Sequence, residues 1–183
     1  MNRTSVSDEE IVLKNSIQII YKIKIFILNS SFKLTTFYTS RIESMLADVA
    51  MVSNTNDSRY LLNKSLSGYT VNIFNNLKLV FIKDSNVDYE FGTGLVKITP
   101  GHSQIDFLLH KKNNLKIINI LNLDGSFNNK TGIYFGTPMY ECRKKIYVLL
   151  RNLKIVIYEK QYNTLLSYSE KSNLLVEPLL SNQ

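Results

Sequence analysis

The chain has 183 residues, of which 44% are hydrophobic and 20% charged, and this balance excludes a largely disordered protein while allowing one domain with a substantial core. The formal net charge of +7 favours a polyanionic partner such as RNA. The single cysteine excludes an internal disulfide, and two histidines leave little material for a metal centre.

The first predicted element is a β-hairpin. Residues 1–15 are expected to form a lead-in segment. From Ile17 to Ile27, isoleucines and Tyr21 alternate with more polar residues, and a period of two with β-branched side chains is typical of a half-buried strand. Residues 29–31 have the composition of a turn, and residues 32–39 alternate again, so they are predicted to be the partner strand.

Short strands and one helix are predicted for the middle of the chain. Asp57 is expected to cap a brief turn at residues 59–61. Asn75-Asn76 is a dipeptide that favours a hairpin turn. Residues 103–112 are predicted to be helical, with Ser103 as N-cap. The strands predicted in this part cover residues 70–73, 77–82, 95–99 and 117–121.

The clearest helix begins at Thr137-Pro138, where a threonine cap is followed by proline at the first helical position. An Asp124-Gly125 turn precedes this helix, and Cys142 on its apolar face is expected to be a core residue. Late strands are predicted at residues 155–158 and 174–176. The apolar positions that recur at helical spacing are Met139, Cys142, Ile146, Leu149, Leu150 and Leu153.

Many short strands with two or three helices at their ends predict an α+β fold. We expect a single domain over residues 1–183, with a β-barrel-like core of short strands and peripheral helices. The sequence lacks the apolar run of ~20 residues that a membrane span requires. We therefore expect a cytoplasmic protein that does not contact a membrane.

Polar chemistry gathers around residues 90–106. A glycine-rich turn leads into an apolar strand that carries Lys97 and Thr99 to a Pro-Gly corner, and Asp106 follows in the predicted helix. In isolation this pattern is more typical of an ordinary strand–turn–helix corner than of a site. No pair of residues suited to nucleophilic catalysis, such as Ser with His or Cys with His, is evident.

Six segments, in the same order along the chain, resemble the editing domain (connective polypeptide 1) of class I valyl-tRNA synthetases. Residues 39–50 are similar to the threonine-rich peptide TTRPETMLADVAV of that family, and residues 88–100 to its glycine-rich segment. Isoleucyl and leucyl synthetases carry a related insert, and residues 101–106 are closer to the isoleucyl pattern. Arg41 and the Lys97–Thr99 strand fit the valyl form better. The other similar segments are 117–125, 141–146, and the two seams at 7–10 and 176–183.

The resemblance implies an activity and partners. Threonine and valine are nearly isosteric, so a hydrophobic pocket cannot strongly exclude the added hydroxyl, and a second site hydrolyses the mischarged product. The implied reaction is hydrolysis of the ester in threonyl-tRNA(Val). The motifs that bind ATP in the parent enzymes are absent, so no amino-acid activation is expected. The implied partners are the tRNA(Val) acceptor end and the rest of the synthetase, reached through an exit seam at residues 175–183, with a monomeric chain. No cofactor is implied, because ATP and magnesium belong to the catalytic domain.

The resemblance also implies roles for individual residues. The Asp106 carboxylate would hold the substrate ammonium, and Lys97 and Arg41 would hold a phosphate or the terminal ribose. Phe91 would pack beside the substrate, and His102 would line the site. Lys97 and Asp106 are the catalytic candidates, with no metal. The candidates for substrate binding are Thr39, Ser40, Arg41, Ser44, Asp88, Phe91, Thr99, His102 and Ser103.

Three departures from the family pattern support alternative hypotheses. Ser103 stands where the family has a carboxylate near the substrate side chain, Ile42 replaces a proline, and Lys171 replaces a late arginine. A second hypothesis is therefore a catalytically degenerate module that binds the tRNA acceptor end. A third is an isoleucyl-type editing domain. A basic β-barrel that binds RNA nonspecifically is the fourth, although it does not explain the motifs.

Overall fold

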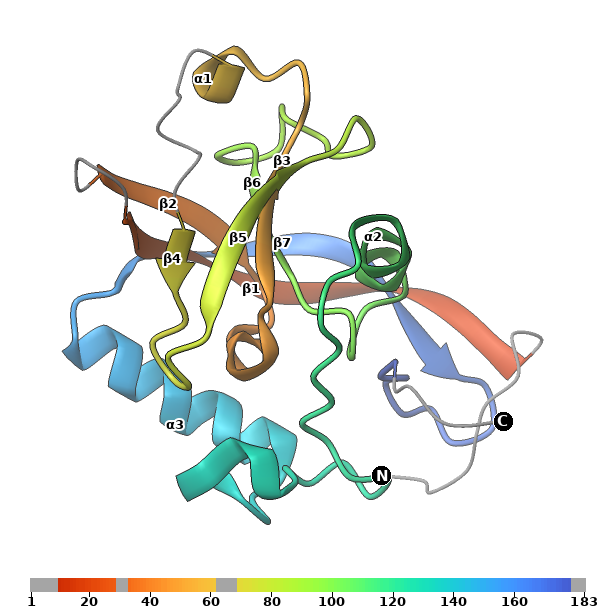
Figure 1. Cartoon of the computed structure of the whole chain (residues 1–183). Helices are drawn as coiled ribbons and strands as arrows, with labels where there is room; N and C mark the ends of the chain where they lie inside the picture. Colours follow the sequence, from red (N-terminus) through yellow and green to blue (C-terminus); the bar gives the residue numbers. More distant parts are fainter. Residues whose placement is uncertain (1–9, 29–32, 62–68, 179–183) are drawn as a thin grey trace.

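The computed structural model describes residues 10–28, 33–61 and 69–178 (Figure 1). The predicted turn at residues 29–31 lies outside the described residues, as do most of the first predicted seam and the last five residues of the predicted exit segment. Among the residues that are described, no helix is long and apolar enough to cross a membrane.

A three-stranded antiparallel sheet confirms the predicted hairpin. Strands β1 (Ile11–Ile27) and β2 (Lys33–Thr39) pair from Tyr21↔Thr39 to Ile27↔Lys33, and β7 (Val156–Ser169) pairs with the other edge of β1. Residues 11–15, which were expected to belong to a lead-in segment, form a ladder with the end of β7.

The outer half of β1 does not bury its isoleucines as predicted. Ile17 and Ile19 are 67% and 40% exposed, whereas Tyr21, Ile23 and Ile27 farther along the same face are buried. The reason is that β1 and β7 continue as a two-stranded ribbon past the edge of the core. The polar composition of residues 159–164 concealed the length of β7, which was predicted only to residue 158. The predicted strand at residues 174–176 is reduced to a single bridge between Leu175 and Tyr168.

The second sheet has four strands in the order β4-β5-β3-β6. The pair β4 (Tyr69–Val71) and β5 (Lys78–Lys83) is antiparallel and confirms the predicted hairpin, with Asn76 at a positive φ of 56°. Strand β3 (Ala50–Ser53) lies between β5, which is parallel to it, and β6 (Leu95–Ile98), which is antiparallel. The sheets remain open, so the α+β class is confirmed while the barrel-like closure is not.

The helices surround the sheets. Two of them, α2 (Gln104–Asn113) and α3 (Met139–Asn152), follow the predictions closely, except that Pro138 and not Thr137 occupies the N-cap position of α3. A one-turn helix, α1 (Ser58–Leu61), follows Asp57 as expected. Two 3-10 helices were not predicted: η2 (Ile42–Ala47) and η4 (Asn129–Tyr134).

The segment at residues 117–121 is not the strand that its apolar composition predicts. It runs extended without a ladder, and only Leu121 forms an isolated bridge, to Phe127. The backbone N–H of Ile120 donates instead to Nε2 of His102, at 3.1 Å. This segment therefore supports the histidine and extends neither sheet.

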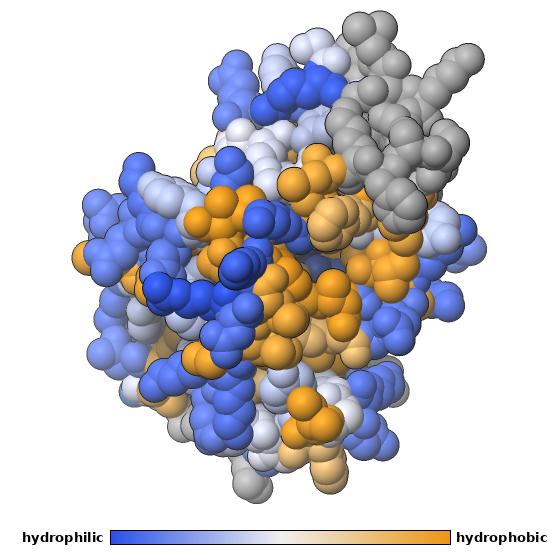
Figure 2. Space-filling model, turned by 90° about the vertical axis from the view of Figure 1, so that its left-hand side faces the viewer, coloured by the Kyte–Doolittle hydropathy of each residue, from blue (hydrophilic) through white to orange (hydrophobic). Residues whose placement is uncertain are grey.

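Helix α3 packs its apolar face into the main core. Met139, Cys142, Ile146 and Leu150 are buried, which confirms Cys142 as a core residue. Leu149 and Leu153, predicted on the same face, are exposed. Apolar side chains also reach the surface elsewhere: Figure 2 shows the left-hand side of Figure 1, where they gather at the centre of the face among hydrophilic ones.

A buried ion pair joins α3 to η2. The Glu43 carboxylate, 2% exposed, accepts hydrogen bonds from Nε and Nη2 of Arg143, both at 2.7 Å. A bidentate pair of this kind is both strong and directional. It holds η2, which leads into the polar cluster described below, against the helix.

Arg143→Met tests this attachment. Removing Arg143 leaves the buried Glu43 carboxylate with only Arg41, whose Nε lies 3.9 Å away without a hydrogen bond, and we expect a loss of about 3 kcal/mol in the free energy of unfolding. Urea denaturation of the whole chain measures it. Lys145→Met is the matched control on the same helix, because its ion pair with Glu141 is exposed; its unfolding midpoint should hardly change. Equal midpoints for the two variants would contradict a structural role for the buried pair.

Candidate functional site

The first part of the candidate site is the corner where β2 ends and η2 begins. The backbone N–H of Arg41 donates to Oγ1 of Thr39 at 3.1 Å, and Oγ of Ser44 donates to the carbonyl of Arg41 at 2.8 Å. Ile42, which stands in place of the family's proline, is fully buried in η2. Hydrogen bonds and apolar burial thus fix this corner without the proline.

Lys97 on β6 lies beneath that corner. Its ammonium donates to Oγ of Ser44 (2.7 Å), Oδ1 of Asp48 (2.7 Å) and Oγ1 of Thr99 (2.6 Å). The Lys97 side chain is 9% exposed and that of Asp48 4%. An ammonium has three N–H donors, so all of them are used inside the chain. The phosphate or ribose contact that the resemblance implies for Lys97 would have to displace one of these bonds.

A tight turn connects β6 to α2. The backbone N–H of His102 donates to the carbonyl of Thr99 at 3.1 Å. Gly101 is required here, because a Cβ at this position would lie 2.3 Å from the carbonyl oxygen of Ile118. One turn later, Oδ2 of Asp106 accepts the backbone N–H of Thr99 at 2.7 Å. The helix therefore returns its carboxylate to the end of β6.

Ser103 caps α2. Its Oγ accepts the backbone N–H of Asp106 at 3.3 Å, which confirms the predicted N-cap. Aspartate and serine are both favoured at this position, so the serine found here preserves the cap of the family pattern. The Ser103 O–H remains available as a donor. Lys171, which stands where the family has a late arginine, forms an ion pair with Glu10.

His102 is buried and neutral. Its Nε2 accepts from the Ile120 backbone, so the ring proton is assigned to Nδ1, which has no partner among the described residues. Desolvation, followed by the charges of Arg41 and Lys97, lowers the His102 pKa from 6.5 to about 3. A neutral imidazole shielded from solvent is poorly suited to accepting a proton from bulk water.

Arg41 connects the corner to the C-terminal segment. One guanidinium N–H donates to the carbonyl of His102 at 2.8 Å, and another to Oε2 of Glu177 at 2.7 Å. Burial raises the pKa of Glu177, and the charge of Arg41 acts against that shift. Nε of Arg41 lies 3.9 Å from Oε1 of Glu43. Arg41 is therefore partly neutralised by two carboxylates.

Eight of the eleven predicted site residues form one hydrogen-bonded network. Within it, Asp106, Arg41 and Ser103 are partly exposed, while the other members are buried. The network thus has an outer layer that solvent reaches and an inner layer that supports it. Its members are Thr39, Arg41, Ser44, Lys97, Thr99, His102, Ser103 and Asp106.

The other three predicted residues lie outside this network. Ser40 is partly exposed at the same corner, and its side chain forms no hydrogen bond with another described residue. Asp88 is exposed, and its Oδ1 accepts the backbone N–H groups of Glu90 and Phe91, so it caps its own loop. Phe91 is 55% exposed. The contact between Gly92 and the ring of Tyr38 places this loop beside the end of β2.

The sequence-based prediction missed Asp48. This carboxylate follows the buried run from Ile42 to Ala47 and is itself 3% exposed. A charged residue in such a run must be paired, which is the signal that could have identified it. Oδ1 of Asp48 accepts from Lys97 and also from Oγ1 of Thr99, at 2.6 Å.

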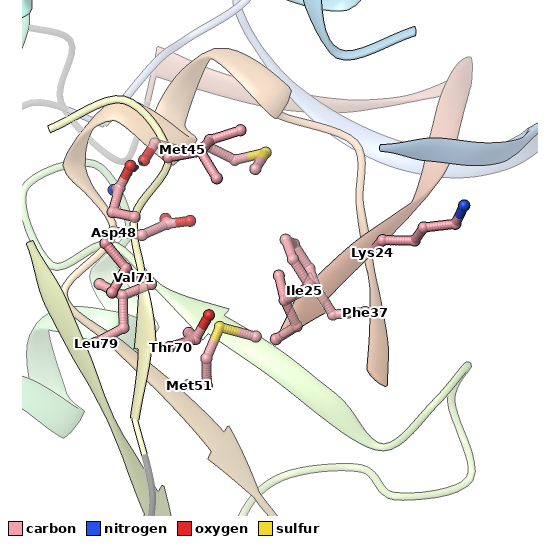
Figure 3. A pocket seen from close by; sticks show the side chains of 11 residues that line it. Lys24, Ile25, Phe37, Met45, Asp48, Met51, Thr70, Val71 and Leu79 are labelled. Carbon is pink, nitrogen blue, oxygen red and sulfur yellow. Dashed lines mark hydrogen bonds between the residues drawn. The ribbon is translucent and has the colours of Figure 1, made fainter. Parts of the chain in front are cut away.

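Asp48 also borders a small cavity between β1–β2 and the second sheet (Figure 3). Its volume is about 20 Å³, enough for one water molecule and too small for an aminoacyl group. This cavity is therefore not the binding site of an aminoacyl group. Within the described parts of the chain, no group of three or more His, Cys, Asp or Glu residues is arranged to hold a metal ion.

Comparisons with known proteins follow the sequence motifs. No family model matches the chain. It is 38% identical to the valine–tRNA ligase of Ureaplasma parvum serovar 3 over 183 residues, 38% to that of Mycoplasma mycoides subsp. mycoides SC over 181, and 34% to that of Streptococcus thermophilus over 182. Each match covers 99% of this chain and 20% of the relative, so the chain spans about one-fifth of the length of these relatives. The resemblance to valyl-tRNA synthetases is confirmed.

Two solved structures share the fold. One is the Agrobacterium radiobacter K84 agnB2 LeuRS in a ternary complex with tRNA and LeuAMS, with a TM-score of 0.57, 11% identity, and coverage of 84% of this chain and 20% of that one. The other is GlLeuRS-CP1, with a TM-score of 0.57, 9% identity, and coverage of 77% of this chain and 99% of that one. The second match pairs almost the whole of one CP1 (connective polypeptide 1) domain with this chain.

The buried neutral state of His102 predicts a pH dependence of stability. The folded-state pKa is lowered, so the unfolded chain binds the proton first, and stability present above pH 6.5 is lost as the pH falls toward about 3. Between pH 7.5 and 5.0 we expect a loss of about 2 kcal/mol in the free energy of unfolding, measured by urea denaturation.

Two substitutions test whether His102 causes this loss of stability with falling pH, which is referred to below as the slope. In His102→Gln the loss over the same pH interval should largely disappear, because glutamine can accept the Ile120 N–H and does not titrate. His110→Gln alters the other histidine of the chain and should retain the slope. An unchanged slope in His102→Gln would contradict the assignment.

Proposed function

We propose that this chain hydrolyses the ester of threonyl-tRNA(Val). Two findings support the proposal. The chain's sequence is similar over 99% of its length to about one-fifth of valine–tRNA ligase, and its fold is that of a synthetase CP1 editing domain. The reaction is post-transfer proofreading in protein synthesis. The parent enzyme would be an ATP-dependent valine–tRNA ligase, and activation of valine would belong to a part of it outside this chain.

One observation carries the proposal: three separate segments bring their predicted residues into a single network. Residues 39–44, 97–99 and 102–106 come from the end of β2 with η2, from the end of β6, and from the start of α2. An ordinary strand–turn–helix corner would not require the first segment to share hydrogen bonds with the other two. The convergence supports a built site.

The outer layer supplies the groups that would contact substrate. The Asp106 carboxylate, near the N-terminus of α2 and partly exposed, would bind the α-ammonium of the aminoacyl group. The Ser103 hydroxyl would hydrogen-bond the threonine hydroxyl, without the charge assistance of an aspartate. Arg41 would lie toward the terminal ribose or a phosphate. Phe91 would pack beside the substrate if its loop moved closer.

Water is the proposed nucleophile. It attacks the ester carbonyl, the tetrahedral oxyanion collapses, and the tRNA hydroxyl leaves with a proton. His102 is buried and its unprotonated Nε2 already accepts the Ile120 N–H, so it is not the proposed base. A second water or the adjacent tRNA hydroxyl would carry the proton. No cofactor takes part in this scheme.

The proposed partners are the acceptor end of tRNA(Val) and the rest of the synthetase, with the chain as a monomer. The net charge of +7 is compatible with tRNA binding. Since the relatives are about five times longer, we expect the isolated chain to bind tRNA weakly and with strong salt dependence.

Deacylation of threonyl-tRNA(Val) compared with valyl-tRNA(Val), at micromolar protein, tests the proposal. We expect threonine-selective hydrolysis. Asp106→Asn keeps the shape and removes the charge, so kcat/KM should fall about 10- to 100-fold, the range for one charge-assisted hydrogen bond. Glu170→Gln removes an exposed carboxylate elsewhere and should leave kcat/KM unchanged.

The possible failures have different meanings. Unchanged kinetics in Asp106→Asn would refute the role of Asp106. No hydrolysis above background, even after the missing synthetase body is supplied, would refute the editing activity. Measurable tRNA affinity in that case would favour the degenerate binding module.

A further inference from the structure

The strongest unassigned feature is Asp48, which the site prediction did not include. Its carboxylate lies among buried groups, and the charged residues that act on it are Lys97 from β6 and Asp106 from α2. Desolvation raises the Asp48 pKa, while the charge and hydrogen bond of Lys97 oppose that shift. The short contacts to Lys97 and Thr99 are those expected of a carboxylate, which can only accept.

The donors and acceptors of this cluster can be assigned from the heavy-atom contacts. Since the Asp48 carboxylate only accepts, the Thr99 hydroxyl donates to it and accepts from the Lys97 ammonium. In the same way, the Ser44 hydroxyl accepts from Lys97 and donates to the carbonyl of Arg41. Each hydroxyl group therefore has one fixed acceptor for its proton, and this assignment depends on the charge of Asp48.

The chain of contacts continues to the outer layer. Thr99 is held through its side chain by Lys97 and Asp48, and its backbone N–H donates to Oδ2 of Asp106 at 2.7 Å. If Asp48 lost its charge, the Lys97 ammonium would be buried without a counter-charge and would have to move or rebond. A displaced Thr99 would then no longer present its N–H to Asp106.

We infer that Asp48 is a positioning residue: it anchors Lys97 below the site and, through Thr99, fixes the Asp106 carboxylate where the substrate ammonium would bind. The functional part of this inference rests on the proposed editing reaction. Asp48 acts through other residues, so it is not a catalytic residue. The alternative is a buried ion pair that contributes to stability alone.

Two measurements on Asp48→Asn separate these cases. In the first, hydrogen exchange of the Thr99 amide, followed by NMR, should accelerate about 10-fold or more as its bond to Asp106 loosens. In the second, kcat/KM for threonyl-tRNA(Val) should fall about 10-fold, mainly in kcat. The first measurement needs no activity. If the wild-type chain proves inactive even with the missing synthetase body supplied, the proposed function fails and the exchange rate still decides whether Asp48 positions Thr99.

The chain provides a matched control in Asp84→Asn. Asp84 is another buried carboxylate, paired with Lys112 at 2.6 Å and outside the network. Its substitution should lower stability while Thr99 exchange, relative to other protected amides, and kcat/KM stay within about twofold. Equal effects of Asp48→Asn and Asp84→Asn on both readouts would overturn the inference.

A double variant covers the case in which Asp48→Asn does not fold. The double variant Asp48→Asn/Lys97→Gln buries no charge at this pair, and it is compared with Lys97→Gln alone. Thr99 is held by both members of the pair, so both variants should have a kcat/KM below that of the wild type and faster exchange of the Thr99 amide. A double variant with wild-type kcat/KM and wild-type Thr99 exchange would overturn the inference.

Discussion

The buried ammonium of Lys97 is the constraint on which the candidate site depends. An ammonium removed from water needs a counter-charge and three acceptors, and here they come from three places along the chain: Ser44 in η2, Asp48 just after η2, and Thr99 just after β6. Satisfying one group thus fixes the position of η2 relative to β6. The corner at Arg41 and the turn into α2 are then held at their distances from each other.

Local signals predicted most of the elements, and long-range burial explains the failures. The hairpin of β1 and β2, the cap at Ser103 and the helix after Pro138 each follow from a few neighbouring residues, and each is found. Strand β3 was missed because a fully buried strand has no alternation. Residues 117–121 have a strand's composition, but they form no ladder with a described strand, and the Ile120 N–H donates to His102 instead.

The sequence identified most of the residues that lie together in the candidate site, but not which of them are buried and which are partly exposed. Motif resemblance identified eight residues that the fold joins, although it could not distinguish Asp106 and Arg41 at the surface from Lys97 beneath them. That distinction depends on packing between segments about fifty residues apart, which no local pattern records. Asp48 interrupts an apolar run, which signals a buried pair, but its partner Lys97 lies 49 residues away and the run does not identify it.

The net charge of the chain does not describe the charge of the candidate site, because the cations there are paired with carboxylates. Three cations in and beside the network, Arg41, Lys97 and Arg143, lie among four carboxylates, those of Glu43, Asp48, Asp106 and Glu177. This neighbourhood therefore has no excess positive charge, and long-range attraction of a polyanion must come from exposed lysines elsewhere. Added salt would weaken that attraction through screening, whereas the short buried contacts are screened far less. Capture of a nucleic acid and discrimination at its end would thus respond to ionic strength independently.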